Sequence, residues 1–125
     1  RDIQVFRNGS EGAPTVVATF VYGDSLQVGP APPEAYSVFL IASDPDGSGY
    51  QTTYVDYRVW SQHGKGAARY FGRMDVDADG TRELILEVLG ESSVWIAILK
   101  REDVGWSESY RDSCGLPAPV ATGAP

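Results

Sequence analysis

Short runs of β-branched and aromatic residues alternate with turn residues along most of this sequence. Residues 15–22 read Thr-Val-Val-Ala-Thr-Phe-Val-Tyr and end at a Gly-Asp pair, and residues 36–42 end at Ser-Asp-Pro-Asp-Gly. Apolar runs bounded by Gly, Pro and Asp are typical of strands that finish in tight turns. No segment keeps the period of an amphipathic helix over several turns. The pattern therefore predicts a chain built almost entirely of β-strands.

The predicted strands are short and regularly spaced. They are residues 3–7, 15–22, 36–42, 51–61, 69–74, 84–89, 94–99 and 106–111. Residues 84–89 and 94–99 are the most apolar pair, and the Gly-Glu-Ser-Ser segment between them predicts an antiparallel hairpin. About eight strands at a spacing of roughly 8–12 residues are expected of sandwiches, barrels and propeller fragments. We predict an all-β fold, an antiparallel β-sandwich-like or propeller-blade-like domain.

The length and composition fit one domain with a tail. The chain has 125 residues, of which 42% are hydrophobic, enough for an ordinary core. We assign residues 1–115 to the domain. Residues 116–125 are uncharged and rich in Pro and Ala, which predicts an extended tail or linker. Apolar runs such as residues 36–42 are far shorter than the roughly 20 residues of a membrane span, so no span is predicted.

The charge balance bears on the class of partner. With 17 acidic and 10 basic residues the net charge is −7. Nucleic-acid binding needs a basic face, so we expect no nucleic-acid partner. An acidic balance instead favours cations.

The most informative motif is the acidic segment of residues 75–83, Asp-Val-Asp-Ala-Asp-Gly-Thr-Arg-Glu. Calcium takes 6–8 oxygen ligands, and carboxylates at alternate positions of a curled loop can supply them. A glycine at the sixth position permits the sharp turn that such a loop requires. The predicted Ca²⁺ ligands are Asp75, Asp77, Asp79, Glu83 and the backbone carbonyl of Thr81.

The segment is not an EF-hand, because Leu86 stands where an EF-hand places its last glutamate and both flanks are predicted strands. A DxDxDG loop followed by an acidic residue and an apolar strand resembles the FG-GAP/VCBS class of repeat. The resemblance covers about residues 70–99 and implies the ligand roles just given. It also implies a blade of the integrin-α-like propeller class, which is common in secreted bacterial proteins. The Phe71-Gly72 pair stands closer to the loop than that family's FG pair, and no GAP signature follows Leu86.

A fainter version of the acidic loop precedes the first by 31 residues. Asp44, Asp46 and Ser48 occupy its first, third and fifth positions. They form a second, weaker candidate metal loop. Because two carboxylates make a poor calcium cage, the favoured interpretation is a turn started by Asp-Pro-Asp-Gly.

A histidine, the aromatic residues and two candidate glycosylation sites bear on catalysis and on glycan binding. His63 lies in a Gly-rich turn, and no Ser-His-Asp or Cys-His arrangement follows from the spacing, so we do not expect an enzyme. The three tryptophans and seven tyrosines could form a sugar-stacking platform, but aromatics on alternating strands are more often core residues or cross-strand pairs. Asn8 lies in an Asn-Gly-Ser sequon and Thr122 lies in a Pro/Ala context, which makes both candidate glycosylation sites.

The sequence thus predicts an extracellular calcium-stabilised structural domain, secreted or at the cell surface. We expect it to self-associate into a homo-oligomer or filament, with residues 2–7 or 116–125 docking on a neighbour. The alternative is a calcium-dependent adhesion or carbohydrate-binding module with a glycan partner. A small secreted hydrolase is less favoured.

Overall fold

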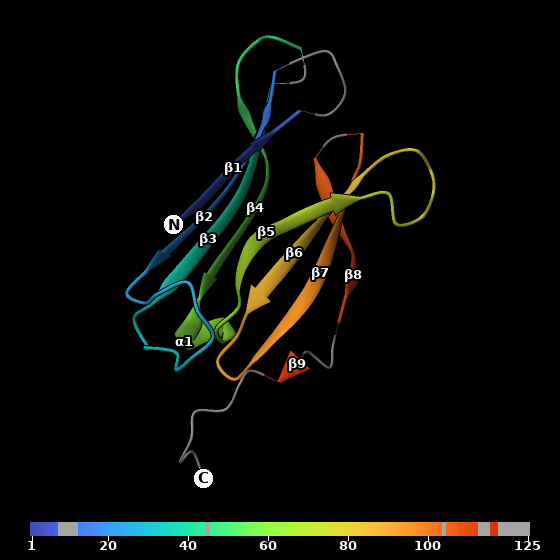
Figure 1. The fold of residues 1–125 in the computed structure, drawn as a ribbon. Helices are drawn as coiled ribbons and strands as arrows, with labels where there is room; N and C mark the ends of the chain where they lie inside the picture. Colours follow the sequence, from blue (N-terminus) through green and yellow to red (C-terminus); the bar gives the residue numbers. More distant parts are fainter. Residues whose placement is uncertain (8–12, 45, 104, 113–115, 118–125) are drawn as a thin grey trace.

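Two antiparallel four-stranded sheets form the body of the protein (Figure 1). The computed structural model describes residues 1–7, 13–44, 46–103, 105–112 and 116–117. The first sheet contains β1 (Asp2–Phe6), β2 (Thr15–Tyr22), β3 (Tyr36–Ser43) and β4 (Gln51–Val59) in that order. The second contains β5 (Ala67–Met74), β6 (Glu83–Leu89), β7 (Ser93–Arg101) and β8 (Trp106–Arg111), and short β9 (Leu116–Pro117) pairs with β7. Each sheet is a meander, and the predicted all-β antiparallel class is confirmed.

The inner faces of the two sheets enclose the core. Alternation along β2 and β3 directs Val17, Phe39 and Ile41 inward, and Leu84 and Leu99 meet them from the second sheet. All five side chains are almost completely removed from water. No helix in the described part of the chain is long and apolar enough to cross a membrane.

The predicted hairpin has the expected partners. β6 pairs antiparallel with β7 in a register that places Leu84 opposite Leu99 and Leu89 opposite Val94. Predicted and observed strands agree within about two residues at most ends, which is the ordinary uncertainty of strand boundaries.

The predicted strand 51–61 is wrong at its end, because the chain turns at Trp60 into the short helix α1 (Trp60–His63). Trp60 is buried in a second small cluster with Ala35, Ala67 and Leu89. Burying the indole there outweighs continuing an edge strand, and Gly64 ends the helix with a positive φ of 76°.

A buried ion pair fastens the β2–β3 loop to the segment after α1. The ammonium of Lys65 lies 2.8 Å from Oδ2 of Asp24, and the lysine side chain is 1% exposed. Its Nζ also lies 4.9 Å from the centre of the Trp60 ring. The connections at this end of the sandwich are therefore tied to its core.

The predicted tail lies mostly outside the described residues, and so do the two candidate glycosylation sites. Leu116 and Pro117 pair with the second sheet as β9, so the predicted tail begins with two residues that belong to the fold. Residues 118–125, including Thr122, and Asn8 lie outside the described residues. Trp60 is buried, and Trp95 and Trp106 pack against the main core, as expected of core residues. Four of the tyrosines do not follow this expectation, because more than half of each is exposed: Tyr22, Tyr50, Tyr57 and Tyr110.

Candidate metal centre

The connection from β5 to β6 gathers the four predicted carboxylates. One carboxylate oxygen from each of Asp75, Asp77, Asp79 and Glu83 lies within 4.8 Å of those of the others. Met74 ends β5 and pairs with Glu83 at the start of β6, so the loop closes on its own hairpin (Figure 1, the loop leaving the end of β5). The sequence therefore identified the four side chains that the fold brings together.

The loop curls because its aspartates bind its own backbone. Asp75 accepts hydrogen bonds from the N–H groups of Asp79 at 3.1 Å and Gly80 at 2.8 Å, through different oxygens. Asp77 accepts from Asp79 N–H at 3.2 Å, and Asp79 accepts from Thr81 N–H at 2.8 Å. These local bonds replace ladder bonds and hold the carboxylates on the concave side of the turn.

Two residues in the loop have left-handed backbone conformations. Gly80 has a φ of 88°, which explains the glycine at the sixth position. Ala78 has a φ of 59°, a conformation that costs an L-residue roughly 1–2 kcal/mol. Nothing in the sequence signalled the strain at Ala78, because alanine is not typical of this region. The loop is held in a conformation that its local preferences alone would not select.

Glu83 differs from the three aspartates because it is buried. Its side chain is 1% exposed, and Oε2 accepts a hydrogen bond of 2.7 Å from Val76 N–H. Its Oε1 is buried and accepts no hydrogen bond from the described residues. A buried carboxylate oxygen without a donor is unfavourable, and nearby carboxylates add repulsion. Among the described residues, Glu83 is therefore the least compensated carboxylate of the cluster.

Lys100, which the sequence reasoning missed, reaches the cluster from β7. Its Nζ lies 2.6 Å from Oδ2 of Asp77 and 3.3 Å from Oδ2 of Asp79. The hydrogen bond from Lys100 lowers the pKa of Asp77, and hydrogen bonds to Asp77 and Asp79 raise the pKa of Lys100. The register that sets Leu84 opposite Leu99 also brings the next residues, Glu83 and Lys100, to the same end of the hairpin. The pairing of β6 with β7 is therefore the feature from which Lys100 could have been predicted.

One lysine does not balance the cluster. Four ionised carboxylates against one ammonium leave a local charge of −3, and both aspartate–lysine contacts are solvent-exposed. Exposed ion pairs are screened and weak. The cluster therefore keeps an excess of negative charge, which a further cation would offset.

Thr81 lies beside the cluster and is exposed. Its N–H binds Asp79, as described above, while the ligand role of its carbonyl remains a prediction.

The second candidate loop, with Asp44, Asp46 and Ser48, is closed by its own hydrogen bonds. Oδ1 of Asp46 accepts both the N–H and the hydroxyl of Ser48, which lowers the pKa of Asp46, and Asp44 accepts Gly49 N–H at 3.2 Å. The Asp46–Ser48 bond is that of an Asx turn, whereas the Asp44–Gly49 bond spans five residues, as the Asp75–Gly80 bond does in the first loop.

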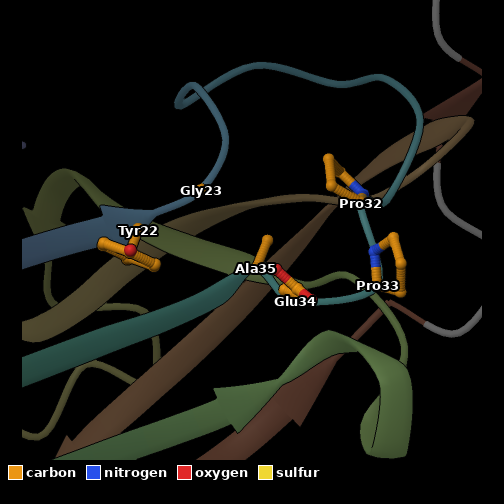
Figure 2. A pocket seen from close by; sticks show the side chains of 6 residues that line it. All are labelled: Tyr22, Gly23, Pro32, Pro33, Glu34 and Ala35. Carbon is orange, nitrogen blue, oxygen red and sulfur yellow. The ribbon is translucent and has the colours of Figure 1, made fainter.

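A shallow hollow of about 470 Å³ lies at the end of β2 and the start of β3 (Figure 2). It is lined by Tyr22, Gly23, Pro32, Pro33, Glu34 and Ala35. Glu34 is its one carboxylate, so the lining does not place two carboxylates together.

Comparison of the chain with protein-family models, with curated proteins and with solved structures finds no significant match. Its function has to be argued from its own residues.

Proposed function

We propose that this chain is a calcium-stabilised β domain that works outside the cell and binds one Ca²⁺ ion in the loop of residues 75–83. The main support is Glu83, whose Oε1 is buried without a donor among the described residues beside three aspartates. A cation held there would pair with the buried carboxylate and relieve the repulsion within the cluster.

The donor set favours calcium over other common metals. All four candidate side chains are carboxylates, whereas zinc and copper sites use His or Cys. Magnesium demands a near-ideal octahedron and keeps several waters, while calcium accepts 6–8 oxygens in irregular geometry. Four carboxylates that can each give one or two oxygens, with the Thr81 carbonyl, match the calcium requirement.

The role that we propose for the ion is structural. It would join Asp75, Asp77 and Asp79, which belong to the loop, to Glu83, which belongs to β6. Glu83 is followed by Leu84, a residue of the core, so the ion would fasten the loop to the buried part of the second sheet. Extracellular modules bind calcium with Kd values of about 10⁻⁴–10⁻³ M, which suits an exposed loop outside the cell.

The proposal is tested by calorimetric titration and by thermal unfolding with calcium, with magnesium and with chelator. Calcium should bind with a stoichiometry of one and raise the melting temperature, because a ligand that binds the folded state stabilises it. Asp77→Ala should weaken binding, and Asp46→Ala, in the other acidic turn, is the matched control that should not. An equal melting temperature with calcium and with chelator would refute the structural role.

A further inference from the structure

The strand residues on the outward face of the first sheet carry no charge. Strand pairing aligns the alternate residues that point away from the core, from all four strands. They are Ile3 and Val5 on β1, Val16, Ala18, Phe20 and Tyr22 on β2, Tyr36, Val38, Leu40 and Ala42 on β3, and Val55, Tyr57 and Val59 on β4. We call these residues the apolar face. A sheet with one face in water normally alternates apolar and polar residues, and these four strands do not.

Much of the apolar face is accessible to water. Val5, Tyr22, Val55 and Tyr57 are 56–63% exposed, and Ile3 and Phe20 are 49% and 40% exposed. The tyrosines form a row, with ring centres 5.1 Å apart between Tyr22 and Tyr36 and 5.7 Å apart between Tyr36 and Tyr57. An apolar area of this kind on a chain in water marks an interaction surface.

The outward face of the second sheet is different. There Arg69 on β5 forms an ion pair with Glu87 on β6, and Lys100 reaches the acidic loop from β7. The lack of charge is therefore a property of one face and does not follow from the composition of the whole chain, which carries 27 charged residues among 125 (10 basic and 17 acidic).

We propose that the apolar face is the interface of a symmetric dimer, in which it packs on the same face of a second copy of this chain. A two-fold interface places each patch against itself, so a charged residue near the axis would meet its own like charge. A face without charge satisfies this condition. Twisted sheets of the same hand also pack face to face, about 10 Å apart, with their strands at about 30°.

The accessible area is large enough for a dimer. Taking about 200 Å² for a whole aromatic side chain and about 120 Å² for Ile or Val, the six most exposed side chains present about 500 Å² per copy. Two copies would then bury about 1,000 Å², with the half-buried members of the face adding more, and a specific interface needs about 1,000 Å². The proposal is independent of the calcium site. It shares Ile3 and Val5 with the predicted contact segment of residues 2–7, but it packs sheet face on sheet face and does not use residues 116–125.

Sedimentation velocity on the full chain tests the proposal. At about 100 μM, where a Kd of about 1 μM gives near-complete association, the wild type should sediment as a dimer of twice 13.5 kDa. Phe20→Lys and Val55→Lys each place a charge on the apolar face and should yield monomers. The matched control is Phe71→Lys, which changes an exposed aromatic residue on β5 of the other sheet and should leave the dimer intact. Circular dichroism shows whether each variant is folded.

The effect of salt on the dimer and the deletion of residues 118–125 give two further measurements. Each copy carries a net charge of −7, so salt should strengthen an apolar dimer by screening the repulsion between copies. A wild type that stays monomeric at about 100 μM overturns the proposal, as does a dimer that survives both Phe20→Lys and Val55→Lys. A monomer that dimerises only after deletion of residues 118–125 would assign the face to the chain's own tail. Open-ended assembly insensitive to Phe20→Lys would also refute it.

Discussion

Replacing Glu83 with glutamine separates the two roles of this buried side chain. The amide oxygen of the new side chain can still accept the hydrogen bond from Val76 N–H, which is 2.7 Å long in the wild type. The amide nitrogen then replaces the unpartnered oxygen, and it can donate to a neighbouring aspartate. The substitution also removes one negative charge from a group of four carboxylates. Without calcium, Glu83→Gln should therefore be at least as stable as the wild type.

With calcium, the wild type should become more stable than Glu83→Gln. For a Kd of about 0.1 mM, calcium at about 10 mM stabilises the folded wild type by about 2.7 kcal/mol. An unfolding entropy of about 2.1 cal/mol/K per residue gives about 0.26 kcal/mol/K for 125 residues. The wild-type melting temperature should then rise by about 10 °C. Glu83→Gln should show a small part of this rise, since an amide nitrogen cannot ligate calcium.

Differential scanning calorimetry with chelator and with calcium measures both effects on the same samples. The matched control is Glu87→Gln, four residues further along the same strand, where Glu87 pairs with Arg69. That variant should keep the full calcium shift, because its carboxylate lies outside the cluster. A calcium shift in Glu83→Gln equal to that of the wild type would refute the assignment of Glu83 as a ligand. A large loss of stability without calcium would show that the buried charge is already compensated in the metal-free protein.

Three further outcomes are expected. Lys100→Gln should raise calcium affinity several-fold in calorimetric titration, because Lys100 Nζ occupies oxygens of Asp77 and Asp79 that the ion would share. The hydrogen bond from Lys100 lowers the pKa of Asp77 below its ordinary 3.8. The stability from this contact is therefore present above pH 3.8 and is lost as the pH falls through the lowered pKa. Melting curves of metal-free Lys100→Gln should lack that loss. Leu99→Ala should reduce the free energy of unfolding by about 2–5 kcal/mol in urea titration, because Leu99 is fully buried. Burial, with Asp56 and Glu108 nearby, raises the pKa of Tyr54 above 10.0, so its contribution to stability holds below pH 10 and is lost as pH rises through the raised pKa. Tyr54→Phe should remove one tyrosine that ionises above pH 10.0 in ultraviolet titration.

The strands and the acidic cluster could be predicted because their signals are local. Gly80 and the hydrogen bonds of the alternating aspartates to nearby N–H groups specify a curled loop, although Ala78 is held there in a conformation that alanine does not favour. The hairpin of β6 and β7 is specified in the same way, by two apolar runs around a short turn segment.

The features that were missed depend on tertiary contacts. Trp60 continues the alternation of β4, and only the cluster with Ala35 and Leu89 explains why the chain turns there. Lys100 is an ordinary residue near a strand end until the hairpin register brings it to the loop. The apolar face was hidden because residues 15–22 place β-branched or apolar residues on both faces, with Thr15 and Thr19 on the inward one, and such a run does not reveal which side is covered.

The calcium loop and the apolar face belong to different sheets, and this separation has a consequence for how the two proposals depend on each other. Phe20 points away from the core of the first sheet, whereas Glu83 begins a strand of the second, with Phe39 and Leu84 buried between the sheets. Calcium can therefore affect dimerisation only by raising the folded fraction, since no described residue belongs to both sites. At temperatures where the metal-free chain is fully folded, calcium should leave the dimer dissociation constant unchanged, and Phe20→Lys should leave the calcium affinity unchanged. Coupling between them under those conditions would mean that the two sheets change their packing together, contrary to the rigid core that joins them.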